Sequence, residues 1–181
     1  MGTDTQGVCS NCNELEPYFQ HGISLFAFTN IGRDFIHTLK YKQGTYLSSD
    51  IFRMLDHEAE RLTVLHQSCF VPVPLHFLRK WKRGYNQSDI IAKALAKHCH
   101  GRFCDILKRK INTSSQTSLT RSERKKNVEN AFMLNVKTIS PKSRYVLVDD
   151  VFTTGATLNA CAKVLYQAGA RDIHVFTLAH G

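Results

Sequence analysis

The chain has 181 residues, of which 43% are hydrophobic, and this is enough for one domain with a substantial core. No apolar run reaches the roughly 18 residues of a membrane-spanning helix, and the N-terminus, MGTDTQGVCSNC, lacks the basic and apolar regions of a signal peptide, so we expect a cytoplasmic protein with reduced cysteines. The net charge of +9 favours a polyanionic partner, either a phosphate-rich small ligand or nucleic acid.

Apolar periodicity predicts strands that alternate with helices. Strands are expected at residues 23–28, 68–73, 103–107, 131–136, 146–151 and 173–178. Helical spacing is seen in four sets of residues, which are Ile31, Phe35 and Leu39; Ile51, Leu55, Ala59 and Leu62; Ile90, Ile91, Ala94 and Leu95; and Leu158, Cys161, Ala162, Leu165 and Ala168. Residues 112–130 are polar and charged, which predicts a long mobile loop. This order indicates a mainly parallel sheet covered by helices on both faces.

The most informative segment reads VLVDDVFTTGATL, from Val146 to Leu158. Two adjacent acids, Asp149 and Asp150, end an apolar strand, where open α/β sheets place their ligands. The turn that follows leads into a helix, whose N-terminus favours a phosphate group, and Gly155 removes the Cβ that would block its close approach. The acids are candidates to hold ribose hydroxyls and a hydrated Mg²⁺.

A second segment, VPVPLHFLRKWKRGYNQS from Val71 to Ser88, joins a strand to a helix that begins at Asn86 or Ser88. Its prolines stiffen the end of the strand, and Arg79 and Arg83 can bind phosphate oxygens through two hydrogen bonds each. A third segment, from Thr113 to Phe132, carries further basic residues, among them Arg121 and Arg124.

Cys9 and Cys12 form a Cys-x-x-Cys pair close to the N-terminus. Such a pair is half of a zinc site, because tetrahedral zinc needs four ligands. No second pair follows, so either the front of the chain is shortened or the pair is a remnant. The pair makes Zn²⁺ binding a hypothesis with an incomplete ligand set.

The acidic segment resembles the phosphoribosyl pyrophosphate (PRPP) motif of type I phosphoribosyltransferases. The second and third segments resemble the ComF family, bacterial phosphoribosyltransferase-like proteins associated with competence for DNA uptake. The second segment matches the family pattern V-P-V-P-L followed by R-G-F-N-Q, except that Tyr85 stands where Phe is usual. The third segment matches it at Thr113, Gln116, Leu119, Arg124, Asn127, Ala131 and Phe132.

The resemblance implies a type I phosphoribosyltransferase fold: a mainly parallel five-stranded sheet flanked by helices, with PRPP and Mg²⁺ as ligands. Residues 1–22 would form a remnant or partial zinc-ribbon-like segment and residues 23–181 the phosphoribosyltransferase-like domain. This domain would include a hood from Ile23 to Lys42 together with later insertions. The 5′-phosphate would be bound by Thr153, Thr154, Gly155, Ala156 and Thr157. The diphosphate would be bound by Leu75, His76, Arg79 and Arg83, with Arg121 and Arg124 on a flexible loop that closes over it.

Two functions remain open. The chain could transfer the phosphoribosyl group from PRPP to an acceptor that the sequence does not identify. Alternatively, it could be a non-catalytic competence factor that binds single-stranded DNA or a helicase partner through its basic loops, with Trp81 and Tyr85 as stacking side chains.

Overall fold

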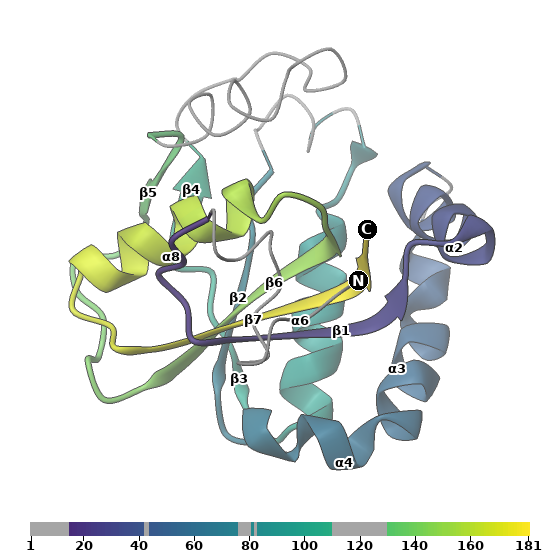
Figure 1. The fold of residues 1–181 in the computed structure, drawn as a ribbon, viewed down its shortest axis with the longest axis horizontal. Helices are drawn as coiled ribbons and strands as arrows, with labels where there is room; N and C mark the ends of the chain where they lie inside the picture. The colour runs from purple at the N-terminus through teal and green to yellow at the C-terminus, as the bar shows by residue number, and fades with distance from the viewer. Residues whose placement is uncertain (1–14, 42–43, 76–80, 82, 110–129) are drawn as a thin grey trace.

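Five parallel strands form the centre of the protein in a computed structural model, which describes residues 15–41, 44–75, 81, 83–109 and 130–181 (Figure 1). Their order across the sheet is β1-β7-β6-β2-β3, and each neighbouring pair is parallel. The strands are β1 (His21–Ala27), β2 (Cys69–Pro72), β3 (Arg102–Phe103), β6 (Arg144–Phe152) and β7 (Asp172–His180). The predicted mainly parallel five-stranded sheet is confirmed.

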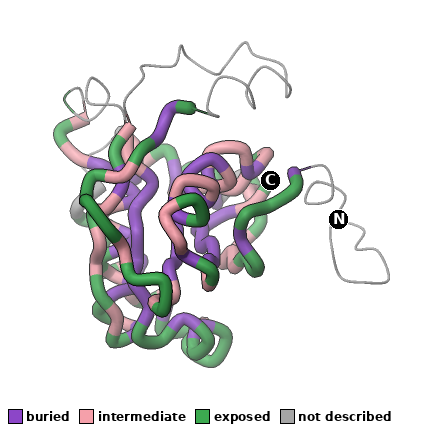
Figure 2. Tube along the Cα trace, turned by 90° about the vertical axis from the view of Figure 1, so that its left-hand side faces the viewer, coloured by how far each residue is buried: buried purple, intermediate pink, exposed green. Residues whose placement is uncertain are grey.

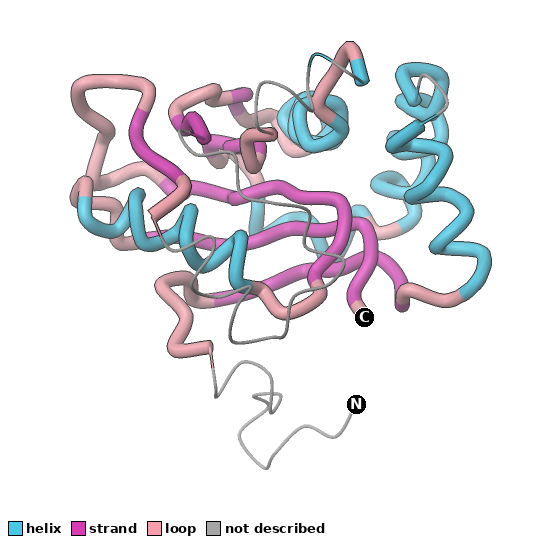
Figure 3. The backbone as a smooth tube through the Cα atoms, turned by 90° about the horizontal axis from the view of Figure 1, so that it is seen from above, coloured by secondary structure: helices cyan, strands magenta, loops and turns pink. Residues whose placement is uncertain are grey.

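Helices cover both faces of this sheet (Figures 1 and 3). One face packs against the helices between β1 and β3, which are α2 (Asn30–Tyr41), α3 (Ser48–His57), α4 (Ala59–Leu62) and α6 (Gln87–His98), with the short 3-10 turns η1 (Gly44–Leu47) and η2 (Thr63–Leu65). The other face packs against α8 (Ala156–Gln167) and the segment of residues 15–20. Among the described residues, no helix is both long and apolar enough to cross a membrane.

Strand β6 shows how the sequence produces this layered core. Side chains alternate between the faces of a strand, so Val146 and Val148 pack toward α6 while Tyr145 and Leu147 pack toward α8. All four are buried, and Figure 2 shows buried segments running through the middle of the molecule. A strand buried on both faces has to be apolar throughout, which makes the two acids that follow unusual.

Residues 102–109 differ from the single strand predicted at 103–107. They form two short strands: β3 lies in the main sheet, whereas β4 (Leu107–Arg109) pairs antiparallel with β5 (Phe132–Leu134). The chain therefore leaves the main sheet between Phe103 and Leu107. The prediction of a strand or hairpin arm at residues 131–136 is confirmed.

Two further predictions were wrong. The hood predicted from Ile23 to Lys42 is not one unit, because β1 is an edge strand of the main sheet and only α2 lies beyond its end. The helical face of Ile51, Leu55, Ala59 and Leu62 is interrupted at Glu58, so α3 and α4 are separate and Ala59 is exposed.

The connections identify where a ligand would bind. From β2 the chain continues through α6 to β3 on one side, and from β6 it continues through α8 to β7 on the other side. Neighbouring strands whose connections diverge leave a crevice at their carboxyl ends, and ligands of open α/β sheets bind there. The candidate site therefore lies where β2 and β6 end.

Candidate functional site

The acidic pair lies near the carboxyl end of β6. Asp149 is partly buried, and its Oδ1 accepts hydrogen bonds from the Asp150 backbone N–H (2.9 Å) and from the Ser88 hydroxyl (3.0 Å). Burial and the charge of the neighbouring Asp150 carboxylate raise the pKa of Asp149 to about 7. Asp149 therefore keeps its proton at a higher pH than an ordinary aspartic acid does.

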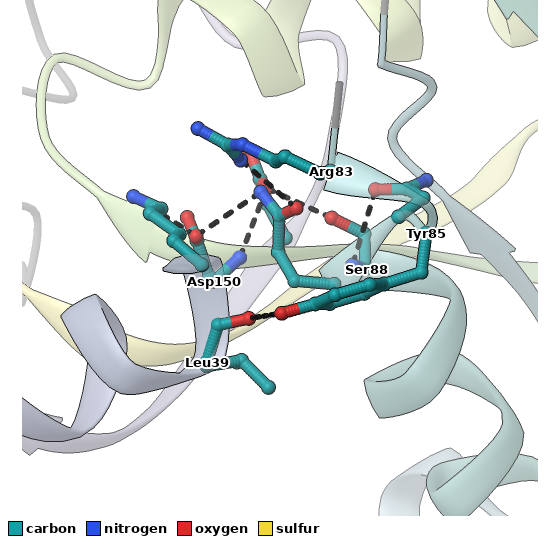
Figure 4. A network of polar contacts seen from close by, with 9 residues as sticks. Leu39, Arg83, Tyr85, Ser88 and Asp150 are labelled. Atoms are coloured by element: carbon teal, nitrogen blue, oxygen red, sulfur yellow. Dashed lines mark hydrogen bonds and ion pairs between the residues drawn. The ribbon is translucent and has the colours of Figure 1, made fainter. Parts of the chain in front are cut away.

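Asp150 is more deeply buried and is held by two side chains from other elements. Its Oδ2 lies 2.9 Å from Lys40 Nζ on α2 and accepts a hydrogen bond from Gln87 Nε2 on α6 at 3.3 Å. The Gln87 Oε1 accepts in turn from Arg83 Nη1 at 3.2 Å. Figure 4 shows this network, in which Leu39 from α2, Asp150 from β6, and Arg83, Tyr85 and Ser88 from the segment that begins α6 lie close together.

A tight turn follows β6 and starts α8. Gly155 is the N-cap of α8 and has a left-handed backbone (φ 71°). Asp149 and residues 153–158 line a small open pocket of about 40 Å³ at this turn. Thr154 Oγ1 accepts from the Ala156 N–H at 3.4 Å, while Thr153, Thr154 and Thr157 supply hydroxyls around it. The free amides of a helix N-terminus together with hydroxyl groups can bind an anion.

Gly155 also has a packing role. A Cβ built at this position would lie 2.6 Å from Phe152 Cζ and 2.7 Å from Leu15 Cδ2. The missing side chain therefore makes room for these two apolar groups, and the left-handed backbone favours glycine independently. The role of Gly155 in the close approach of an anion stays a prediction.

Asn86 fixes the start of α6 against the end of β2. Its Oδ1 accepts from the Ser88 N–H at 3.3 Å, and its Nδ2 donates to the Val73 carbonyl at 3.1 Å and to Asp89 Oδ1 at 2.8 Å. This confirms the predicted helix start. Because Gln87 and Ser88 follow directly, the cap also aims both side chains at the acidic pair.

A larger pocket of about 210 Å³ lies between the end of β2 and the β4-β5 ribbon. Leu75, Asn86 and Asp89 line it on one side, and Lys108 and Arg109 line it on the other. Neither Asp149 nor Asp150 is among the residues that line it.

The structure brings part of the predicted site together. Asp149, Thr153, Thr154, Gly155, Ala156 and Thr157 line one pocket, and Arg83 is joined to Asp150 through Gln87. Leu75 lies at the neighbouring pocket instead. Six predicted residues lie outside the described part of the chain: Cys9, Cys12, His76, Arg79, Arg121 and Arg124.

Sequence reasoning missed Lys40, Gln87 and Ser88 as members of this site. Gln87 and Ser88 close the quoted V-P-V-P-L segment, so their position in it was a usable signal. Lys40 has no such signal, because a lysine in the last turn of a helix is ordinarily explained by the helix dipole. Among the described residues, no three His, Cys, Asp or Glu side chains form a group that could hold a metal ion.

Comparison with known proteins agrees with this geometry. Residues 65–181 match the family described as Phosphoribosyl transferase domain. The chain is 33% identical over 177 residues to Competence protein F from Haemophilus influenzae, covering 94% of this chain and 77% of that protein. It is 32% identical over 176 residues to DNA utilization protein YhgH from Escherichia coli K12, covering 94% and 76%.

More distant similarity extends to Competence protein ComFC from Streptococcus pneumoniae, at 29% identity over 94% of this chain and 76% of that protein. A solved purine phosphoribosyltransferase from Pyrococcus horikoshii aligns with a TM-score of 0.43 and 13% identity over 75% of this chain and 83% of that one. The family match and the level of identity to the competence and DNA utilization proteins decide the assignment: the chain belongs to the ComF/YhgH family and carries a phosphoribosyl transferase domain.

Proposed function

We propose that this protein binds PRPP together with Mg²⁺ and transfers the phosphoribosyl group to an acceptor. The observation that carries the proposal is the position of the acidic pair. Asp149 and Asp150 lie where β2 and β6 end, beside a turn that offers amides and hydroxyls to an anion. PRPP combines ribose hydroxyls with two phosphate-bearing ends, which suits these two kinds of group.

The 5′-phosphate is assigned to the turn before α8. There Thr153, Thr154 and Thr157 donate hydroxyl groups, while the amides near Gly155 and Ala156 point from the helix N-terminus. The diphosphate is assigned to the segment after β2, which contains Leu75, His76, Arg79 and Arg83. Of these four residues, Arg83 has a described link to the acidic pair.

The donor set fits Mg²⁺ that arrives with its ligand. Mg²⁺ prefers hard oxygen ligands and retains water, so one or two carboxylates and substrate phosphates are enough to hold it. Asp149 supplies such a carboxylate at the pocket, and the adjacent carboxylate of Asp150 adds a second negative group beside it. When bound, Mg²⁺ would neutralise charge on the diphosphate.

In the proposed reaction, the bond between ribose C1 and the diphosphate oxygen breaks, and its electron pair leaves with the diphosphate. The acceptor forms a new bond to C1 and loses a proton. The transition state carries positive charge on the ribose, so the protein acts mainly by positioning groups and stabilising the departing diphosphate. Asp150, held by Lys40 and Gln87, would orient the ribose hydroxyls.

The test is ligand-dependent thermal stability. A ligand at a hundred times its Kd stabilises the native state by about 2.7 kcal/mol, so saturating PRPP with Mg²⁺ should raise the melting temperature clearly. Thr157→Val should reduce this shift, whereas Thr138→Val, at an exposed position away from the site, should keep it. A wild-type protein that shows no shift with PRPP and Mg²⁺ would overturn the proposal.

A second function is favoured by one observation. Trp81 is 84% exposed in the segment after β2, next to Arg83. An exposed tryptophan among basic residues suits base stacking on single-stranded nucleic acid, and relatives of the chain are named for competence and DNA utilization. Under this alternative, the protein handles single-stranded DNA in the cytoplasm during natural transformation, alone or with a helicase, and single-stranded DNA stabilises the fold while PRPP does not.

A further inference from the structure

Helix α2 brings a lysine to the acidic pair, although α2 is distant in the sequence from the other elements of the site. Lys40 lies in the last turn of α2, and its Nζ is 2.9 Å from Asp150 Oδ2. The Lys40 side chain is 27% exposed, whereas that of Asp150 is 7% exposed. The ammonium group is therefore bound to a buried carboxylate, while the Lys40 side chain stays partly exposed.

The end of α2 is held in place by the segment that follows β2. The Tyr85 hydroxyl donates to the Leu39 carbonyl at 2.5 Å, and the Leu39 side chain is fully buried (Figure 4). This bond satisfies one of the carbonyls that lack a partner at the end of a helix. Lys40 follows Leu39 directly, so its backbone is positioned by the same segment that carries Arg83.

The contacts of Asp150 converge on one oxygen. Among the described residues, both of its side-chain contacts, from Lys40 and from Gln87, are made to Oδ2. Oδ1 is thereby left for a ligand hydroxyl. The Lys40 ammonium has three donors, of which the described residues use one, on Asp150. The other two can donate to a second anion.

Charge explains why a second anion would bind there. Two neighbouring carboxylates repel a diphosphate, and Lys40 neutralises one of them. Three consecutive contacts form a chain of side chains that has a cation at each end: Lys40, Asp150, Gln87 and Arg83. Stability alone is a weak reason for the ion pair, because buried ion pairs often contribute little net stability.

We infer that Lys40 is a substrate-binding residue whose ammonium bridges Asp150 and the diphosphate of bound PRPP, and that it thereby selects diphosphate-bearing ribose phosphates over ribose 5-phosphate. The assignment rests on the proposed function. It makes α2 part of the substrate site and gives Lys40 a role in specificity that differs from that of the turn before α8, which reads the 5′-phosphate common to both ligands.

The experiment compares the Kd of three ligands: PRPP with Mg²⁺, inorganic diphosphate with Mg²⁺, and ribose 5-phosphate. Lys40→Met removes the charge at similar length, Lys40→Gln keeps a hydrogen-bond donor that protects the fold, and Lys40→Arg keeps the charge. Lys142→Met is the matched control, because Lys142 is exposed in the turn before β6 at the opposite end of the strand.

The loss of a charge-assisted hydrogen bond lowers affinity by roughly 10- to 150-fold. We expect Lys40→Met and Lys40→Gln to lose about this much affinity for PRPP and for diphosphate but less than about threefold for ribose 5-phosphate. Lys40→Arg should recover part of the loss, and Lys142→Met should match the wild type.

Two results would overturn the role of Lys40 and leave the proposed function standing. One is wild-type affinity for PRPP in both uncharged variants. The other is an equal loss for all three ligands, which would make the ion pair structural. A wild-type protein that binds neither PRPP nor diphosphate would instead overturn the proposed function and this assignment with it.

Discussion

Removing the charge of Asp149 should make the protein more stable at neutral and alkaline pH. Asn at this position keeps an oxygen that can accept from Ser88 and from the Asp150 N–H, so the hydrogen bonds of the site persist. The substitution removes a carboxylate that is shielded from water and repelled by the neighbouring Asp150, whose own charge is paired with Lys40. Active-site residues commonly lower the stability of a fold in exchange for activity.

The magnitude follows from the pKa. The native pKa of Asp149 is about 7, against an ordinary value of 3.8. The native state therefore binds more protons than the unfolded state between these values, and the wild type loses stability as the pH rises toward 7. Each pH unit contributes about 1.36 kcal/mol. The stability of Asp149→Asn relative to the wild type should thus grow by about 2.5 kcal/mol from pH 5 to pH 8.

The assay is urea unfolding of both proteins at several pH values between 5 and 8. Asp34→Asn is the control, because Asp34 is exposed on α2, and its difference from the wild type should not vary in the same way. A difference between Asp149→Asn and the wild type that stays constant over this range would refute the reasoning. So would an Asn variant that becomes less stable, relative to the wild type, as the pH rises.

Three other substitutions test the neighbouring elements. In thermal unfolding, Gly155→Ala should lower stability by about 2–3 kcal/mol, because it adds backbone strain and crowds Phe152. Gly169→Ala should show the cost of backbone strain alone, because Gly169 has φ 103° and open space around it. Asn86→Ala should cost about 2–3 kcal/mol in urea unfolding, because it removes a helix cap and buried hydrogen bonds; a loss below about 0.5 kcal/mol would contradict the role of the cap. Trp81→Ala should leave stability unchanged and, if single-stranded DNA binds here, weaken binding by about 1–3 kcal/mol in fluorescence anisotropy; an equal loss in a variant of the exposed Tyr46 would argue against stacking at Trp81.

The elements that the sequence predicted well are those in which local pattern and tertiary environment agree. The run from Val146 to Phe152 is apolar on both faces because α6 and α8 bury both, and this leaves the two acids as the exception. The turn after it is recognisable because Gly155 has to adopt a left-handed backbone just before a helix. Both features are local, so they can be read without knowing the fold.

The errors arise where tertiary contacts decide. The spacing of Ala59 with Leu55 is helical, yet the helix breaks at Glu58 and turns Ala59 outward. Residues 21–27 have the length of a strand, but their pairing with β7 could not be seen in the sequence. Lys40 is the clearest case, since only the approach of α2 to β6 brings it to Asp150, more than a hundred residues later in the chain.

Calorimetric titration with PRPP and Mg²⁺ tests the central proposal most directly. The wild type and the double variant Asp149→Asn, Asp150→Asn would be compared, with Asp34→Asn as the control for loss of an exposed carboxylate. Circular dichroism would establish that each protein is folded. We predict that the wild type and the control bind with the same affinity, while the double variant shows no measurable heat of binding. Unchanged affinity in a folded double variant would contradict the assignment of the acidic pair to PRPP.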